Sequence, residues 1–461
     1  MFDRTVQKRV FAVWRRVFAL SWPVMTEQVL RTLMRTTDII VAGFFSPAAV
    51  AAVGLADIYS RLTLWIGLGI GDGAIALSSQ DTGSGSMANR NEAVTQAILI
   101  GILVGIPFMI FGLVGSFWAI EILGAEAETV RLGGLYLTVI MFSAPAYHVT
   151  MIAARSIQGT GDTRTPMYVN AAANSLNIVL TVCLAFGLGP LPELTVVGIA
   201  VATAIGDTLA AVVFLAIIYS PWSELSFVWP QEYIIGKQLI VISAPRVAEG
   251  STELVASFPF NAILLAFGTE VNAAFHIGRR IQQQLSAPLA RGYGVASNII
   301  SGQSLGSGNP DDAYFDGLAA AALSVLSIGS IGIVIFIAAE SITLLFTRDP
   351  ETIEYAVNFT RAYAVSTVLI ACYVVLAGSL RGGSESRPPF IAKVTGMSIF
   401  LLGVTYVFGV RLEYGVTAAY LAIVLDFAWR NIVVGSVYLR KNWLERGAEM
   451  MRERGSVSAE D

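Results

Sequence analysis

Charged residues are scarce in this 461-residue sequence: they make up 13% of the chain, about half of what a soluble protein of that length carries. Hydrophobic residues make up 55%, and the mean hydropathy is +0.67. Apolar runs of about 20 residues, long enough to cross a bilayer as helices, recur from end to end. The shortage of charge therefore excludes a soluble globular protein and predicts an all-α integral membrane protein.

Cysteine and histidine are also rare, with two of each. Cys183 and Cys372 lie inside apolar segments, where cysteine is most often a small packing residue, so we expect neither a disulfide framework nor a metal site there. His148 and His276 have no cysteine or acid at ligand spacing. The glycine-rich turns lack the Lys-Ser/Thr of a phosphate-binding loop, and a net charge of −4 gives no basis for a nucleic-acid partner. We therefore expect no cofactor.

Twelve membrane-spanning helices are predicted from the apolar segments. They cover residues 17–43, 48–78, 92–118, 129–156, 165–188, 194–219, 236–267, 271–302, 312–341, 352–380, 388–409 and 414–439. The connections alternate between short acidic loops and loops that carry much of the arginine. The positive-inside rule then places both termini in the cytoplasm of a multi-pass plasma-membrane protein.

The chain is also an internal repeat. One constant offset relates Gln80, Gly83, Gly85, Glu128, Thr129, Arg164 and Pro166 to Gln303, Gly306, Gly308, Glu351, Thr352, Arg387 and Pro389. An offset shorter by one position relates Pro23, Glu27 and Ala51-Ala52 to Pro245, Glu249 and Ala273-Ala274. Each copy has six predicted spans that begin on the same side, which predicts two pseudo-symmetric lobes related by an axis along the membrane normal. The expected parts are a cytoplasmic lead-in at 1–16, lobes at 17–219 and 236–441, a cytoplasmic linker at 220–235 and a cytoplasmic tail at 442–461.

The first predicted span carries an unusual stripe of charge. Glu27, Arg31, Arg35 and Asp38 lie at helical offsets of 0, 4, 8 and 11, which places them within about 80° of one another around a helix. Each of these charges would cost roughly 2.5–3.5 kcal/mol or more if it faced lipid near the middle of the bilayer. The stripe must therefore line a protein or water-filled interior, and it is the first candidate functional site.

The order and duplication of several motifs resemble one transporter family. The first span ends in T-D-I-I-V-A-G at 37–43, and the loops contain Q-D-T-G-S-G at 80–85, Q-S-L-G-S-G at 303–308, R-S-I-Q-G-T-G-D-T-R-T-P at 155–166 and A-G-S-L-R-G-G-S-E-S-R-P-P at 377–389. Together they resemble the multidrug and toxic compound extrusion (MATE) family to about residue 440. The resemblance implies an antiporter, not an enzyme, that exports organic cations in exchange for inward H⁺ or Na⁺ by alternating access.

Within that family, the chain looks similar to the DinF-like branch. This branch couples transport through an Asp in the first span, matched by Asp38, and through an Asn and an Asp in the fifth span. Here the fifth span has Asn177 at the Asn position but Thr181 at the Asp position. The resemblance implies an H⁺ or Na⁺ site around Asp38 and Asn177, with one coupling acid replaced by a hydroxyl.

Several other polar residues are candidates for the coupling site or the substrate cleft, and each has a structural alternative. Arg35 would either pair statically with Asp38 or tune its binding of H⁺ or Na⁺, and Arg31 would pair with Glu27 at i,i+4. The remaining candidates are Asn170 and Asn174 beside Asn177, Asp207 in the sixth span, and Glu249 and Glu253 in the seventh. The alternatives are interhelical hydrogen bonds and ion pairs. Asp426–Arg430 is expected to be a structural pair.

Two other classes of protein compete with the antiporter. A lipid-linked-saccharide flippase of the same superfamily would favour a longer chain and a strongly cationic cleft, and a membrane prenyltransferase would need clustered acids that bind Mg²⁺-diphosphate, which the loops lack. The antiporter hypothesis predicts small organic cations and the lipid bilayer as partners, and a monomer.

Overall fold

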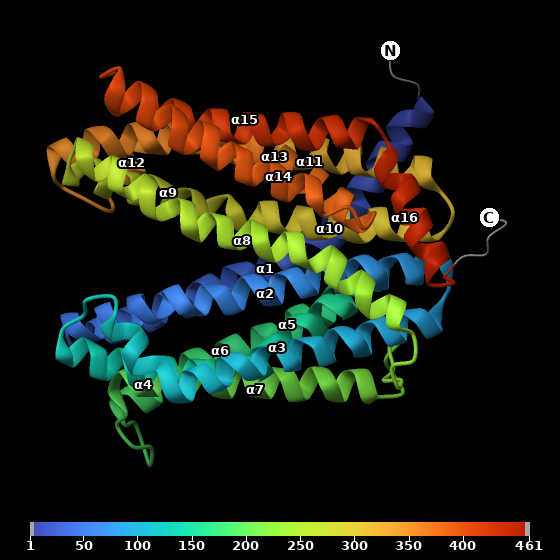
Figure 1. Ribbon diagram of the computed structural model, residues 1–461, viewed down its shortest axis with the longest axis horizontal. Helices are drawn as coiled ribbons and strands as arrows, with labels where there is room; N and C mark the ends of the chain where they lie inside the picture. The colour runs from blue at the N-terminus through green and yellow to red at the C-terminus, as the bar shows by residue number, and fades with distance from the viewer. Residues whose placement is uncertain (1–3, 457–461) are drawn as a thin grey trace. The chain divides into compact units, whose positions relative to one another are not determined.

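A computed structural model describes residues 4–456, and most of this part of the chain is helical, with no strand in it. The helices, labelled in Figure 1 where there is room, are α1 (Arg4–Gly43), α2 (Pro47–Ser84), α3 (Met87–Glu121), α4 (Ala127–Phe142), α5 (Ala144–Gly159), α6 (Arg164–Phe186), α7 (Thr195–Tyr219), α8 (Tyr233–Phe267), α9 (Thr269–Leu285), α10 (Ala287–Gly306), α11 (Pro310–Ile337), α12 (Ala339–Thr343), α13 (Pro350–Gly382), α14 (Arg387–Thr395), the π-helix η1 (Gly396–Arg411), α15 (Thr417–Leu439) and α16 (Asn442–Glu453).

Length and apolarity mark the described helices as membrane spans. Nine helical stretches of the described chain are long and apolar enough to cross a membrane, and the pair α4 and α5 makes a tenth that is bent by 48°. The two remaining predicted spans are α1, which carries the charged stripe, and the polar pair α9 and α10. The predicted all-α membrane fold is confirmed.

Two differences from the predicted spans concern α1 and α4. Helix α1 begins at Arg4, so the expected lead-in at 1–16 is continuous with the first span over its described part. The span predicted at 129–156 is broken after Phe142, where α5 begins with Pro145 in its first turn. A proline has no backbone N–H to donate to the preceding turn, and it is tolerated at the start of a helix. Pro145 therefore stands at a break between two helices.

The chain divides into two compact units. The first contains Thr26–Ser78 and Ser86–Ala244, and the second contains Met1–Met25, Ser79–Gly85 and Pro245–Asp461. The last turns of α2 thus belong to the unit formed mainly by the second half of the sequence. No observation tests the lobe boundaries predicted at 219 and 236, which stay a prediction.

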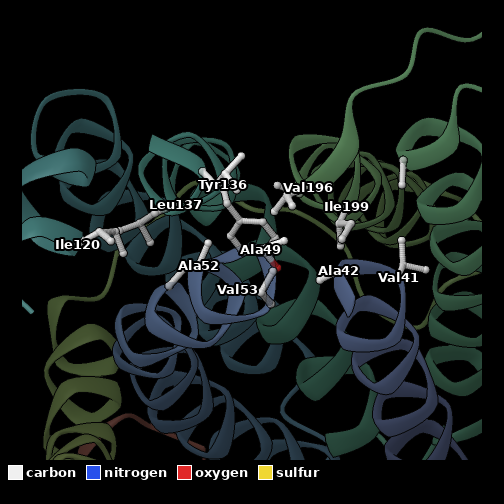
Figure 2. Close-up of a cluster of buried hydrophobic side chains, with 14 of the residues drawn as sticks. Val41, Ala42, Ala49, Ala52, Val53, Ile120, Tyr136, Leu137, Val196 and Ile199 are labelled. Carbon is white, nitrogen blue, oxygen red and sulfur yellow. The ribbon is translucent and has the colours of Figure 1, made fainter. Parts of the chain in front are cut away.

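Small side chains dominate the core of the first unit (Figure 2). Ala49, Ala52 and Ala56 on α2 are completely buried, and Tyr136 and Leu137 on α4 belong to the same cluster. Small residues let membrane helices approach closely, so van der Waals packing replaces the hydrophobic effect that is absent between helices in lipid. This close packing holds α2, α4 and α7 in one bundle.

Aromatic rings form the corresponding core of the second unit. Phe275 lies edge-on to Phe260 at a ring-centroid distance of 5.1 Å and to Phe359 at 5.6 Å. Tyr420 on α15 packs on Phe359 with a centroid distance of 4.6 Å. Edge-to-face pairs of this kind each add about 0.5–1.5 kcal/mol to the burial of the rings. They tie α8, α9, α13 and α15 together.

Glycine allows a reciprocal contact between the ends of α2 and α10 in the second unit. A Cβ atom at Gly83 would overlap the backbone of Gln303, and one at Gly306 would overlap the backbone of Gln80. Gly83 with Gly306, and Gln80 with Gln303, are equivalent positions of the repeat, so the contact has local two-fold symmetry. The turns that follow contain Gly85 and Gly308, both with φ of +74°, a left-handed conformation that favours glycine. These are the tight turns that the sequence predicts.

Helix α16 closes over this junction. Trp443 is 1% exposed, and its indole ring stacks on Tyr438. Arg454, directly after the helix, donates to Asp81 through Nε at 3.0 Å and through an Nη atom at 2.8 Å, and both side chains are 0% exposed. The described part of the expected tail thus packs against the chain and forms a buried ion pair with the end of α2.

Replacing Arg454 with Ala should lower the thermal stability of the purified protein sharply. The substitution leaves the Asp81 carboxylate buried without its charge partner, a change that typically costs about 3–5 kcal/mol. The measurement is the unfolding temperature in detergent. Arg452→Ala is the matched control, because Arg452 is exposed on the same segment. Equal unfolding temperatures for the two variants would show that the buried pair contributes nothing.

Candidate functional site

The charged stripe of α1 divides into two local groups. Glu27 and Asp38 are both 6% exposed, whereas Arg35 is exposed. An Nη atom of Arg31 lies 3.6 Å from Glu27, which confirms the predicted i,i+4 pair. Arg35 forms no ion pair with Asp38 within 4.0 Å in the described structure. The static pair considered for Asp38 is therefore not formed.

Asp38 is instead connected to a row of neutral oxygens on α6. The Thr181 hydroxyl lies 3.3 Å from Asp38 Oδ1 and 3.3 Å from Asn177 Oδ1, so its single hydrogen can be donated to one of the two at a time. Asn177 donates from Nδ2 to the Thr203 hydroxyl on α7 at 3.1 Å. Asn177 and Thr181 are 2% and 0% exposed. The structure thus brings together the three residues that the resemblance implies, and it adds Thr203.

The other asparagines predicted on this face lie on the same helix but outside these contacts. Asn170 is buried, and Asn174 Nδ2 is buried without a hydrogen-bond partner in the described residues. Asn170 lies about two helical turns before Asn177, and Asn174 lies about one turn before it. The predicted stripe therefore exists, with only its last part in contact with the carboxylate.

Glu27 and Asp207 lie in a second group that includes Arg31. Gln158 at the end of α5 donates to Glu27 at 3.4 Å. The carboxylate of Asp207 on α7 interacts electrostatically with Arg31 and Arg35, and its backbone carbonyl accepts a hydrogen bond from Thr150 at 2.9 Å. No hydrogen bond joins Asp207 to Asp38 among the described residues. Asp207 is therefore not a direct neighbour of the Asp38 group.

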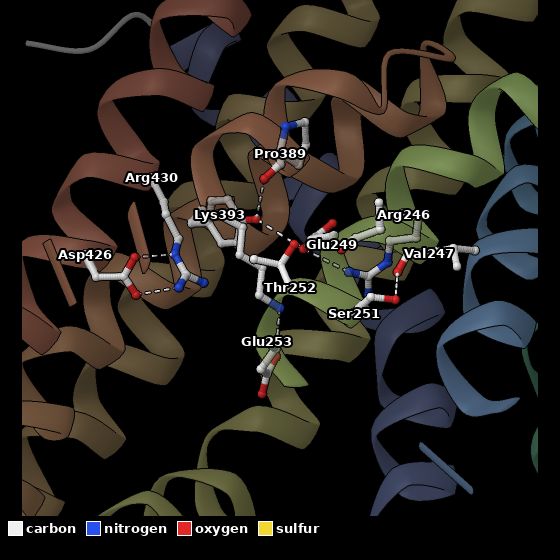
Figure 3. A network of polar contacts seen from close by, with 12 residues as sticks. Arg246, Val247, Glu249, Ser251, Thr252, Glu253, Pro389, Lys393, Asp426 and Arg430 are labelled. Carbon is white, nitrogen blue, oxygen red and sulfur yellow. Dashed lines mark hydrogen bonds and ion pairs between the residues drawn. The ribbon is translucent and has the colours of Figure 1, made fainter. Parts of the chain in front are cut away.

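Glu249, the repeat-mate of Glu27, is paired with two cations in the second unit, and Figure 3 shows its contact with Arg246. Arg246 lies 2.9 Å from one of its oxygens, and Arg381 lies 2.7 Å from the other. Gln158 and Arg381 are equivalent positions of the repeat, so the two glutamates have equivalent partners of different charge. Sequence reasoning missed Gln158 and Arg381, although both stand at the same position of the duplicated loop motif.

The second group of charges in this unit surrounds Glu253 and Asp426. Glu253 pairs with Lys393 at 2.7 Å and with Arg279 at 2.9 Å. Arg430 binds both oxygens of Asp426, as Figure 3 shows, and this confirms the predicted i,i+4 contact. Glu249, Glu253 and Asp426 in the second unit are thus held by basic side chains, whereas Asp38 in the first unit is held by a hydroxyl.

The Asp38 group has the composition of a site for a hard monovalent cation or a proton. A carboxylate with hydroxyl and amide oxygens offers the oxygen ligands that hard cations prefer. No cluster of three His, Cys, Asp or Glu residues that could hold a metal ion occurs in the part of the chain that the structure describes. The chemistry available at Asp38 is therefore the binding and release of one positive charge.

Replacing Arg430 with Gln should destabilise the protein by several kcal/mol, because Asp426 is 2% exposed and would be left as a buried unpaired carboxylate. Arg61→Gln is the matched control: its pair with Asp57 is also i,i+4, but the side chains are 47% and 38% exposed. Such an exposed pair contributes about 0–1 kcal/mol. Thermal unfolding in detergent distinguishes the two, and a loss of stability in the control equal to that of Arg430→Gln would contradict the prediction.

Comparison with known proteins agrees with the family resemblance seen in the sequence motifs. The MatE family model matches the chain twice, over residues 23–183 and 245–407, and the two matches begin at the repeat-related prolines Pro23 and Pro245. A Thermotoga maritima protein described as "Probable multidrug resistance protein NorM" is 25% identical over 450 residues, which cover 97% of each chain. A Bacillus subtilis protein described as "Uncharacterized transporter YisQ" is 21% identical and covers 97% of this chain and 99% of its own.

Solved structures share the fold. A MATE protein crystallised with MaD3S superposes with a TM-score of 0.87 at 19% identity, and the match covers 94% of this chain and 97% of that one. A transporter of the MOP superfamily from Pyrococcus furiosus gives a TM-score of 0.85 at 18% identity, with 95% and 96% coverage. At these identities the match shows the architecture alone.

Proposed function

Because this chain belongs to the MatE family, and is thus a membrane transporter rather than an enzyme, we propose that it is a secondary active antiporter that exports organic cations in exchange for inward H⁺ or Na⁺. The curated relatives that match most or nearly all of its length include proteins described as multidrug resistance proteins. Multidrug efflux by alternating access is the activity that these matches support for the present chain.

The contact of Asp38 with Thr181, which in turn contacts Asn177, is the single observation that carries the coupling step. Asp38 is a buried carboxylate without a basic partner within 4.0 Å in the described structure, so a proton or Na⁺ can neutralise it. Since the Thr181 hydroxyl can turn between Asp38 and Asn177, the site can respond to ion binding with a small change of hydrogen bonding. Glu27 and Asp207, linked through Arg31, form a second acidic group available for the substrate cation.

A monomer with both termini in the cytoplasm fits this proposal. An even number of spans returns the chain to the side on which it begins, and the arginine-rich connections favour the cytoplasm for that side. The coupling ion then enters from outside along the gradient, and the substrate leaves toward that side.

Flipping of a lipid-linked saccharide is the second candidate function. Basic side chains outnumber acidic ones around Glu249 and Glu253, which is the observation in its favour. A relative described as a probable multidrug resistance protein, matched over 97% of both chains, favours the antiporter. Proteoliposomes separate the two: an antiporter moves a soluble fluorescent cation when an ion gradient is imposed, and a flippase moves a labelled lipid-linked sugar between leaflets.

Replacing Asp38 with Asn should abolish gradient-driven efflux and leave the protein folded and inserted. The amide is similar in size but carries no charge for an ion to neutralise. The coupling ion therefore no longer binds there, and its gradient cannot drive the change between the outward-facing and inward-facing states. The measurement is efflux of a fluorescent cation from proteoliposomes under imposed pH and Na⁺ gradients. Asp311→Asn, at a side chain 91% exposed, controls for expression and insertion. Undiminished transport by Asp38→Asn would remove Asp38 from the coupling step.

Replacing Thr181 with Val should shift the ion dependence of transport without abolishing it. Valine keeps the shape but removes the hydroxyl, and hydrogen bonds to charged groups contribute about 1.5–3 kcal/mol, which corresponds to roughly tenfold or more in affinity. If Na⁺ is the coupling ion, its concentration at half-maximal transport should therefore rise about tenfold, because an oxygen ligand is lost. If H⁺ is the coupling ion, the half-maximal H⁺ concentration should instead fall about tenfold, because the ionised carboxylate loses a stabilising donor and is protonated more easily. Thr208→Val is the control, because Thr208 on α7 is exposed and bonds only its own helix backbone. An unchanged ion dependence would mean that the Thr181 contact is only structural.

A further inference from the structure

Equivalent positions of the two repeats carry very different charge. The repeat offsets relate a set of six positions in the first half to six in the second. Val24, Glu27, Arg31, Asp57, Gln158 and Asn170 correspond in this way to Arg246, Glu249, Glu253, Arg279, Arg381 and Lys393. The first set has one basic and two acidic residues, and the second has four basic and two acidic residues. The formal charge therefore changes from −1 to +2.

The six second-half residues, here called the basic cluster, form one connected group. Arg246 and Arg381 pair with Glu249, and Arg279 and Lys393 pair with Glu253. The nearby pair of Asp426 and Arg430 neutralises itself and leaves the excess unchanged. All of these groups lie on helices of the second unit, so the excess positive charge belongs to one compact body.

Two positive charges in excess are unfavourable at this depth. Glu249 lies at the middle of the 35-residue helix α8, and it is 3% exposed. A basic residue in the centre of a membrane helix is energetically costly unless an anion or water compensates it. Arg381 also has a buried Nε atom without a hydrogen-bond partner in the described residues. The basic cluster is therefore short of negative charge and of one acceptor.

The edge of the cluster is open to a ligand. The side chains of Arg279 and Arg246 are 22% and 16% exposed, and that of Glu253 is 32% exposed, whereas Lys393 and Arg381 lie deeper. A guanidinium has five N–H donors in a planar fork that matches a carboxylate, and the recorded contact of Arg279 with Glu253 uses only one of its nitrogens.

We propose that the basic cluster binds a carboxylate group of the exported molecule, through Arg279 at its open edge with Lys393 and Arg381 behind it. This inference rests on the proposed efflux function and specifies its substrate class: molecules that carry a carboxylate as well as a positive charge are preferred over purely cationic ones. The carboxylate supplies the negative charge that the basic cluster lacks.

A matched pair of dyes tests the preference. Rhodamine 110 has a free carboxylate, and rhodamine 123 is the methyl ester of the same xanthylium cation, so the two differ in one negative charge. Binding of each dye to the purified full-length protein in lipid-free detergent is measured by fluorescence anisotropy. The variants are Arg279→Gln and, separately, Lys393→Gln. Each leaves Glu253 with its other basic partner, so neither creates an unpaired buried carboxylate. Arg280→Gln, the next residue on α9 and exposed, is the control for the same change in net charge.

The wild-type protein and Arg280→Gln should bind rhodamine 110 about tenfold more tightly than rhodamine 123, the size of effect expected for one charge-assisted hydrogen bond. Arg279→Gln and Lys393→Gln should lose most of this preference and still bind rhodamine 123 as the wild type does. Equal affinity of the wild type for both dyes, or a preference that survives in both variants, would overturn the proposal.

A second arm separates a substrate carboxylate from a free anion. Sodium acetate or phosphate is added in place of sodium chloride at constant ionic strength. If acetate or phosphate displaces rhodamine 110 only at a concentration far above that of the dye, the result supports a site for the substrate carboxylate. If the free oxyanion binds tightly and the protein does not prefer one dye over the other, the proposal is overturned. If the carboxylate proposal fails in this way, export of rhodamine 123 that still requires Asp38 would support the proposed antiport. Failure of the carboxylate site can therefore be distinguished from failure of the antiporter proposal.

Discussion

Charge inside the membrane must be neutralised or hydrogen-bonded, and this constraint shapes the functional part of the molecule. An unpaired carboxylate or ammonium group in the bilayer interior costs several kcal/mol, so each charged residue of the spans must find a partner. Two kinds of partner occur. Glu249, Glu253 and Asp426 are paired with basic side chains, whereas Asp38 is in contact with a hydroxyl. The second arrangement leaves a charge that a transported ion can balance.

Duplication explains how one architecture contains both arrangements. The backbone positions of Glu27 and Glu249 are equivalent, and so are those of their partners Gln158 and Arg381. A neutral amide satisfies the hydrogen bonding of the first glutamate without cancelling its charge, and an arginine cancels the charge of the second. Glu27 thus has one basic partner, Arg31, whereas Glu249 has two, Arg246 and Arg381, and the change from Gln158 to Arg381 adds a positive charge to the second copy alone.

The fold and part of the site are visible in the sequence because they depend on periodicity and on local spacing. Apolar runs define the spans, and the i,i+4 pairs of Arg31 with Glu27 and of Arg430 with Asp426 follow from helix geometry. Contacts between distant segments do not follow from spacing: Arg454 meets Asp81 and Arg381 meets Glu249 only because the helices pack in a particular way. The absence of an Arg35–Asp38 pair from the described structure is likewise a matter of side-chain direction, since their i,i+3 spacing permits contact.

The junction of α2 with α10 shows how the repeat also limits motion. Gly83 and Gly306 bring two backbones so close that no side chain fits, and the ion pair of Arg454 with Asp81 covers the same place. A contact made of backbone and a fully buried ion pair resists small displacements, because separating it exposes an uncompensated charge. Within the second unit, the end of α2 is therefore fixed by interactions that must be broken together.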